Sequence, residues 1–250
     1  MTVARVVFVH GLRTSATMWR RQLIDLAGHD IDAVAIDLPG HGSRIGEPFT
    51  VSAAMHALAG ALPARDEPAR TTVPPTLLVG LSLGGYLAVE FAARHPGRID
   101  GLVAASCGTR PRGAGLAGYR RLAALIGRLP DRGRALNDAM VRTFLRGAAI
   151  DDVLAGGVAI DVMRPVLTAI SELDPEAALA RVDKPVWFVN GRFDHFRLEE
   201  RRMLRATARG RLVVVPGATH LVSLSRPDDF SAVVLGAVAE LQTLAHRRRA

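Results

Sequence analysis

The chain has 250 residues, of which 49% are hydrophobic, 22% charged and 5% aromatic. This composition excludes a disordered chain and indicates one domain built around an aliphatic core. The formal net charge of +8 comes from basic residues scattered along the sequence with few aromatic residues between them, which argues against a nucleic-acid partner.

Short β-branched runs alternate with longer helical patterns, as is typical of an α/β protein with a mostly parallel sheet and helices on both faces. We expect about six strands, all buried, at residues 3–9, 33–38, 76–81, 99–106, 186–190 and 212–215. Apolar residues at helical spacing predict helices at residues 19–27, 51–62, 84–94, 198–208 and 228–244. Residues 63–75 indicate a loop before the third strand.

One long stretch breaks the alternation. Residues 109–181 contain no convincing strand, but they carry helix-like groups of apolar residues. We interpret this stretch as a helical cap inserted into a core made of residues 1–108 and 182–250.

A serine between glycines follows the third predicted strand, in the sequence Gly80-Leu81-Ser82-Leu83-Gly84. A serine at a sharp strand-to-helix turn has a strained backbone, and glycines two residues away remove side chains that would collide there. The helix that begins at this turn directs free N–H groups toward a reacting carbonyl. We interpret Ser82 as a nucleophile; the alternative is an ordinary turn in which the serine caps the helix.

A serine hydroxyl needs a base, and a histidine at the end of another strand would supply it. His220 follows the predicted strand 212–215 through a short turn that carries it to the carboxyl edge of the sheet. His29, His56, His95 and His246 lie in or near helices, at a helix end or in the tail, and His195 is a competitor. We interpret His220 as the general base; the alternative is a turn residue bonded to backbone.

Asp194 comes just after the predicted strand 186–190 and lies between the serine and the histidine in chain order. A carboxylate beside the base fixes the tautomer of the imidazole and stabilises the imidazolium. We therefore predict that Asp194 orients His220. The alternative is an aspartate that caps the next helix and pairs with Arg192 or Arg197.

The sequence His10-Gly11-Leu12 ends the first predicted strand, and Gly11 lets the backbone approach a bound substrate. If the second strand pairs outside the first and the third lies on its other side, the loops after strands one and three border a topological switch point. The backbone N–H groups of Leu12 and Leu83 would then form an oxyanion hole, with His10 in a structural role.

Five segments together resemble the α/β-hydrolase family, in its serine-nucleophile, esterase-like branch. They span nearly the whole chain and are His10-Gly11, Asp37-Leu38-Pro39-Gly40-His41-Gly42, Gly80-Leu81-Ser82-Leu83-Gly84-Gly85, Gly191-Arg192-Phe193-Asp194 and Gly217-Ala218-Thr219-His220. The resemblance implies a cap inserted after the strand that ends near Ser106. It also implies no metal and no organic cofactor.

The sequence departs from the family's usual pattern at several positions. Arg13 stands where a small residue is common, and it could narrow the mouth of the site or bind an acidic group. Arg44 replaces the serine that commonly follows the Gly-His-Gly turn, and the proline often seen after the acid is missing. There is no room before Val3 for the family's N-terminal hairpin, so we expect a shortened sheet.

The activity that we expect is hydrolysis of a carboxylic ester, with an acyl-enzyme formed on a small-molecule substrate. Thioesterase, lactonase and carbon–carbon bond hydrolase activities are alternatives, since each passes through an oxyanion in the same hole. Relatives that need an aspartate nucleophile are disfavoured. A non-catalytic ligand-binding protein of the same fold is an alternative of another class.

Apolar residues near the predicted site suggest a pocket for a small or medium acyl group. They are Met140, Phe144 and Met163 in the cap and Trp19 in the core, with Arg13 at the mouth. Side chains of this kind at helical spacing pack a core more often than they line a site, so core packing is the alternative for each.

The predicted location is the cytoplasm. Cys107 is the only cysteine, so no intrachain disulfide is possible. We find neither a signal peptide nor an apolar run that could span a bilayer, and we expect no membrane partner. The sequence predicts a solvated tail at Arg247, Arg248 and Arg249. It does not predict an oligomeric state.

Overall fold

The computed structural model describes residues 2–63 and 74–247. In this part of the chain, one sheet has the strand order β2-β1-β3-β4-β5-β6, and every neighbouring pair is parallel. Its strands are β1 (Ala4–Val9), β2 (Ile31–Ile36), β3 (Thr76–Leu81), β4 (Gly101–Ala105), β5 (Val186–Gly191) and β6 (Gly210–Val215). The parallel sheet is confirmed, and so is the pairing of the second and third strands on opposite sides of the first.

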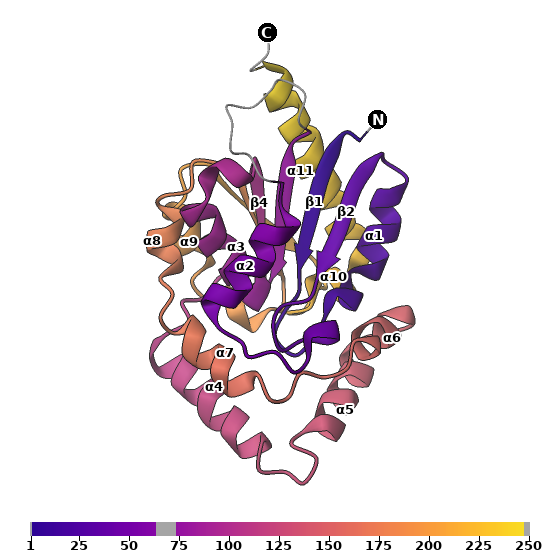
Figure 1. Cartoon of the computed structure of the whole chain (residues 1–250), viewed down its shortest axis with the longest axis vertical. Helices are drawn as coiled ribbons and strands as arrows, with labels where there is room; N and C mark the ends of the chain where they lie inside the picture. Colours follow the sequence, from indigo (N-terminus) through magenta and orange to yellow (C-terminus); the bar gives the residue numbers. More distant parts are fainter. Residues whose placement is uncertain (1, 64–73, 248–250) are drawn as a thin grey trace.

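Helices cover both faces of the sheet (Figure 1). Alternate residues of a strand point to opposite faces, so Val7 and Val9 join one hydrophobic cluster while Val6 and Phe8 join the other. The first cluster packs against α2 (Val51–Ala61), α3 (Leu83–Arg94), α8 (Pro175–Leu179) and α9 (Glu200–Arg205). The second packs against α1 (Arg20–Ala27), α10 (Val222–Ser225) and α11 (Pro227–Arg247).

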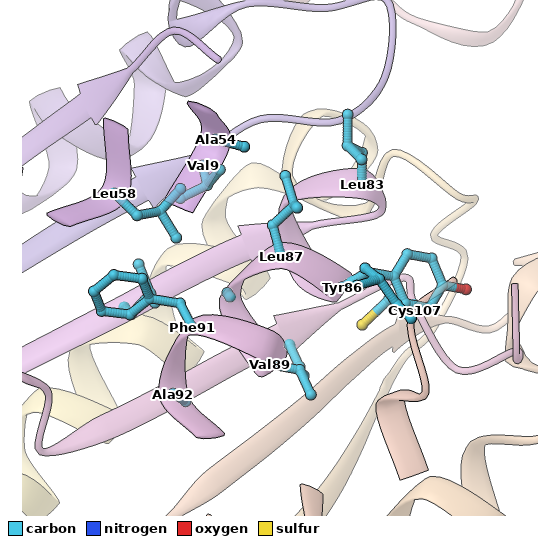
Figure 2. Packing of buried hydrophobic residues seen from close by; sticks show 14 of the residues in the cluster. Val9, Ala54, Leu58, Leu83, Tyr86, Leu87, Val89, Phe91, Ala92 and Cys107 are labelled. Atoms are coloured by element: carbon cyan, nitrogen blue, oxygen red, sulfur yellow. The ribbon is translucent and has the colours of Figure 1, made fainter. Parts of the chain in front are cut away.

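Helix α3 is the best-buried helix next to the site. Figure 2 shows its residues Leu87 and Phe91 in the same apolar cluster as Leu58 of α2 and Val9 of β1. All four of these side chains have no exposed surface. The start of α3, where Ser82 and Leu83 lie, is therefore fixed by packing along the rest of the helix.

The prediction that all six strands are buried is wrong for the two outer ones. Strands β1, β3, β4 and β5 have interior positions in the sheet and are buried almost throughout. Strands β2 and β6 have a neighbour on one side only, and most of their residues keep part of their surface exposed. Alternation along the sequence does not distinguish an edge strand from a central one.

The segment between β4 and β5 is helical, as predicted. It contains α4 (Gly113–Ile126), α5 (Arg134–Phe144), α6 (Ala148–Ala155), α7 (Met163–Ile170) and α8. Figure 1 shows α4 to α7 grouped beyond the carboxyl ends of the strands, whereas α8 packs on α3 beside the sheet. A division at residues 109–181 stays a prediction, because α8 lies with the core helices.

Several boundaries differ from the predicted ones. The helix expected at residues 198–208 is shorter, since a 3-10 turn at His195–Arg197 precedes it. Other 3-10 helices span Ala16–Trp19, Gly42–Arg44 and Pro96–Arg98. Most of the loop predicted at residues 63–75, and the tail residues Arg248 and Arg249, lie outside the described residues. No helix in the described ranges is long and apolar enough to cross a membrane.

Candidate active site

Ser82 lies at a tight turn between β3 and α3. Its backbone has φ +54° and ψ −113°, a conformation that costs free energy for any residue other than glycine. Close packing of the backbone explains the flanking glycines: a Cβ on Gly80 would lie 2.2 Å from the carbonyl oxygen of Gly84, and one on Gly84 would lie 2.3 Å from that of Val9. The Ser82 N–H donates to the carbonyl of Ala105 at 2.8 Å. These contacts hold the strained turn in place.

His220 approaches Ser82 from the loop after β6. Its Nε2 lies 3.1 Å from the Ser82 Oγ. The Ser106 hydroxyl donates to the His220 carbonyl at 2.7 Å, which ties this loop to the end of β4. The His220 side chain keeps about a fifth of its surface exposed, at 21%, so the ring is supported on one side and accessible on the other.

Asp194 follows β5 and accepts a hydrogen bond from His220, with Oδ1 2.9 Å from Nδ1. The two turns are packed tightly, because a Cβ on Gly191 would lie 2.2 Å from the carbonyl oxygen of Thr219. The Asp194 Oδ1 also accepts the N–H of Phe196 at 2.8 Å, so Asp194 caps the 3-10 turn as well. Arg197 pairs with Glu200 instead of Asp194.

The Asp194 carboxylate has no exposed side-chain surface. Burial by itself raises its pKa, but the hydrogen bond and charge of His220 and the N–H of Phe196 outweigh burial and hold the pKa below the ordinary value. An ionised carboxylate only accepts hydrogen bonds, so Nδ1 of His220 carries the proton. Nε2 is then free to accept the hydroxyl proton of Ser82.

The loop after β1 lies against the same turn. A Cβ on Gly11 would lie 3.5 Å from the Ser82 Cβ, and the N–H of Gly84 donates to the His10 carbonyl at 3.1 Å. Leu12 follows in this loop, and Leu83 is the first residue of α3. Within the described ranges, neither of their N–H groups donates to another protein atom. The structure thus brings the two predicted oxyanion-hole residues to loops that border Ser82.

His10 is buried and joins two loops. Its Nε2 accepts the N–H of Leu38 at 3.0 Å, so Nδ1 carries the proton and donates to the Gly11 carbonyl at 2.8 Å. Burial, with the nearby His41 as a second cause, lowers the pKa of His10 to about 3. The ring is therefore neutral near pH 7 and supports the loop that carries Leu12.

His195, the competing histidine, lies near His220 with the two rings tilted and their centroids 5.3 Å apart. In the described part of the chain it makes no hydrogen bond to Ser82 or Asp194. Phe196 lies closer, with its ring centroid 4.8 Å from that of His220. The sequence analysis missed both Phe196 and Ser106, and the only signal for Ser106 was its place at the end of a strand.

The predicted substrate-binding residues are dispersed. Trp19 has no exposed surface and packs between Phe8 and Phe230 in the core, so it does not line a pocket. Met140 and Phe144 lie on α5 with 51% and 60% of their surface exposed.

Met163, at the start of α7, packs partly buried against the first hydrophobic cluster. Arg13 is the one of the five that lies in a loop bordering Ser82, since it follows Leu12 directly.

Comparison with known proteins identifies the family of the chain. The model of the alpha/beta hydrolase family matches residues 6–233. This match covers most of the chain, from the third residue of β1 to the first part of α11. The chain therefore belongs to the alpha/beta hydrolase family, a family of hydrolytic enzymes.

Individual relatives point the same way. The chain is 28% identical over 247 residues to a pimeloyl-[acyl-carrier protein] methyl ester esterase of Neisseria meningitidis, with 92% of each chain covered. A thermophilic esterase from Thermogutta terrifontis has a similar structure, with a TM-score of 0.76, 22% identity and coverage of 96% of this chain and 91% of that one. An enol-lactonase from Burkholderia xenovorans is also similar in structure, with a TM-score of 0.71 and 22% identity. The match covers 94% of this chain and 91% of the lactonase. At 22% identity, the similarity to these two structures shows the fold alone.

Proposed function

We propose that this hydrolase cleaves carboxylic esters with Ser82 as nucleophile, His220 as general base and Asp194 as the residue that orients the base. One observation carries the proposal: an unbroken chain of hydrogen bonds joins the Ser82 hydroxyl to His220 at 3.1 Å and His220 to Asp194 at 2.9 Å. Such a chain activates a hydroxyl that is otherwise a weak nucleophile.

Acylation follows from the proton positions. The Ser82 Oγ attacks the acyl carbon of the ester while its proton moves to Nε2 of His220, and Asp194 stabilises the imidazolium that results. The carbonyl oxygen becomes an oxyanion, which the N–H groups of Leu12 and Leu83 would bind. Nε2 then returns the proton to the departing alkoxide, so an alcohol leaves and an acyl-Ser82 ester remains.

Deacylation repeats these steps with water. His220 accepts a proton from a water molecule, and the hydroxide that forms attacks the acyl carbon of acyl-Ser82. The same two N–H groups would bind the second oxyanion. When this intermediate collapses, the Ser82 oxygen leaves and takes its proton back from Nε2, and the carboxylic acid is released.

We favour esters over other substrates because the relative from Neisseria meningitidis, with 92% of each chain covered, is a methyl ester esterase. Thioesters, lactones and carbon–carbon bonds next to a carbonyl are competing substrates, since their cleavage forms an oxyanion in the same place. A panel of ethyl esters, acyl thioesters, lactones and vinylogous diketones separates these activities by kcat/KM. We expect the ethyl esters to give the highest value.

Site-directed variants test whether the proposed serine mechanism operates. Ser82→Ala removes the nucleophile and is expected to lower kcat for p-nitrophenyl acetate by about 10⁴-fold or more. Ser52→Ala is the matched control, because Ser52 is exposed on α2 away from the site. Hydrolysis by Ser82→Ala at the wild-type rate would refute the mechanism, and absence of turnover on every substrate of the panel would favour a ligand-binding protein.

A further inference from the structure

Arg13 carries a guanidinium group with unused hydrogen-bond donors beside the candidate site. Its Nε is buried and has no hydrogen-bond partner among the described residues. The hydrogen bond that its side chain does make is long, from Nη2 to the Gly133 carbonyl between α4 and α5 at 3.4 Å. A buried donor without a partner is unfavourable, so the group has capacity for an acceptor that the described residues do not provide.

The backbone of Arg13 is strained as well. Its φ is +68°, in the left-handed region that a glycine or asparagine occupies more readily. A long cationic side chain in this conformation costs stability, and such strain concentrates where a side chain is held for binding. Arg13 is held in this way two residues after Gly11, where an added Cβ would lie 3.5 Å from the Ser82 Cβ.

No carboxylate neutralises Arg13 at close range. In residues 2–63 and 74–247, no acidic side chain lies within ion-pair distance of it. Burial lowers the pKa of Arg13, which the phenol of Tyr119 and the carboxylate of Asp138 partly offset from a greater distance. The guanidinium is therefore a half-buried cation that is available to an anion.

Ring contacts connect Tyr119, an electrostatic neighbour of Arg13, to the base. Tyr119 on α4, which interacts electrostatically with Arg13, packs edge-on against Phe196 with ring centroids 6.3 Å apart. Phe196 in turn packs on His220 at 4.8 Å. Arg13 and Tyr119 thus lie on the cap side of the same site as Ser82, and not on a remote surface.

The strand order gives the side of the site on which Arg13 lies. Arg13 follows β1 and His220 follows β6, while β3, which carries Ser82, lies between these two strands. The leaving alcohol must depart near His220, because Nε2 supplies its proton. A substrate group at Arg13 therefore belongs to the acyl part, which stays bound to Ser82.

We propose that Arg13 is a specificity-determining residue that binds a carboxylate at the far end of the acyl group, with the Tyr119 hydroxyl as a second donor. The substrate class is then the half-ester of a dicarboxylic acid. This inference rests on the proposed ester hydrolysis at Ser82. An arginine binds a carboxylate with two parallel hydrogen bonds, and Nε of Arg13 has no other partner among the described residues.

The test is a comparison of two ester series. One contains monoethyl esters of dicarboxylic acids of four to eight carbons, and the other contains ethyl esters of monocarboxylic acids of the same lengths. Acid release is followed in a pH-stat, and kcat/KM of each half-ester is divided by that of its neutral partner. We expect a ratio of at least about 30 at one length, because loss of a desolvated charge pair costs about 2 kcal/mol or more.

Variants test whether Arg13 causes the preference for half-esters, measured as this ratio of kcat/KM values. Arg13→Met is expected to reduce it to about 1, whereas Arg13→Lys keeps part of it because the charge remains but the two-pronged geometry does not. Tyr119→Phe should reduce it by about fivefold through loss of one hydrogen bond. Arg121→Met, which removes an exposed arginine from the same helix as Tyr119, is the control for general charge attraction and should keep the ratio.

The outcomes separate the two proposals. A wild-type ratio near or below 1 at every length, with brisk hydrolysis of the neutral esters, overturns the role of Arg13 and leaves the proposed function standing. An equal fall in the ratio for Arg121→Met also overturns it. No hydrolysis of either series, or hydrolysis that survives Ser82→Ala, contradicts the proposed function itself. If Arg13→Met does not fold, the ratio of the wild type and that of Tyr119→Phe still test the proposed carboxylate site.

Discussion

The turn at Ser82 and the helices α4 and α5 hold their residues in place by different means. At the turn, backbone atoms approach so closely that a methyl group on Gly80 or Gly84 would collide with main-chain oxygens. In α4 no residue is fully buried, and large apolar side chains of α4, α5 and the turn between them are exposed. These are Leu122, Leu125, Leu129, Leu136, Met140 and Phe144.

This difference separates residues whose identity is fixed by backbone packing from residues that packing leaves free to vary. The core determines residue identity at the turn, because only a few residue types satisfy its backbone. The exposed faces of α4 and α5 place no such demand on their residues, so we expect substitutions there to leave the hydrogen bonds among Ser82, His220 and Asp194 intact. Four substitutions or conditions probe this contrast, and their expected effects decrease in size.

The largest effect is expected at Asp194. Asp194→Asn replaces the acceptor for Nδ1 of His220 and favours the wrong tautomer, so kcat for ester hydrolysis should fall by about 10⁴-fold. Asp161→Asn is the matched control, because Asp161 forms an exposed pair with Arg132 in the cap region, where such pairs contribute little. Steady-state kinetics of both variants would count against the account if Asp194→Asn lost less than tenfold.

The turn at Ser82 predicts a loss of stability. Gly84→Ala places a methyl group 2.3 Å from the Val9 carbonyl oxygen, and backbone there must shift. We expect the free energy of unfolding to fall by about 3 kcal/mol, with most activity lost. Gly236→Ala is the control, since a Cβ there meets nothing within 4 Å and should stabilise α11 by up to about 1 kcal/mol. Urea unfolding of both variants gives the comparison, and equal stabilities would contradict it.

The same backbone demands explain what could be predicted from the sequence. Gly80 and Gly84 are needed by the turn, and Asp194 and His220 follow strands whose carboxyl ends meet at one sheet edge. The parallel sheet and the approach of these residues to one another were therefore predictable. The partial exposure of β2 and β6 was not, because it depends on which strands end up at the edges.

Acid should weaken the core through His10. Its pKa is about 3 in the folded protein, against 6.5 for an ordinary histidine. As pH falls below 6.5 the unfolded chain takes up a proton and the folded one does not, so unfolding becomes more favourable until about pH 3. From pH 7 to pH 5 this single group should lower the free energy of unfolding by about 2 kcal/mol.

The variant His10→Asn tests whether His10 causes this loss of stability in acid. Asparagine retains a donor and an acceptor but does not titrate in this range, so the loss of stability between pH 7 and pH 5 should shrink by about 2 kcal/mol relative to the wild type. The absolute stability of the variant is lower, and only the difference between the two pH values matters. An identical pH-dependent loss in both proteins, measured by urea unfolding, would rule out His10 as the titrating group.

The smallest effect on stability is expected in the cap region. Met140→Gln and Phe144→Gln change exposed side chains and should alter the free energy of unfolding by no more than about 0.5 kcal/mol. If these residues contact an acyl chain, kcat/KM for p-nitrophenyl octanoate should fall by about threefold while that for the acetate stays the same. Equal changes in kcat/KM for both esters would show that Met140 and Phe144 do not contact the acyl chain.

The sequence predicted substrate-binding residues from their size and apolarity, which do not show where a side chain lies in the fold. Trp19 has the size and apolarity of a pocket residue, but it packs the core on the face of the sheet that carries α1 and α11. Met140 and Phe144 repeat at helical spacing, yet their face of α5 is exposed. Periodicity shows that a helix has an apolar face, and only the packing of the whole fold shows what that face meets.

Covalent labelling of Ser82 tests the central claim most directly. A fluorophosphonate reacts with a serine that a neighbouring base activates, and mass spectrometry of the digested protein locates the adduct. The account predicts one adduct, on the peptide that contains Ser82, in the wild type and none in Ser82→Ala. Equal labelling of the two proteins would contradict it.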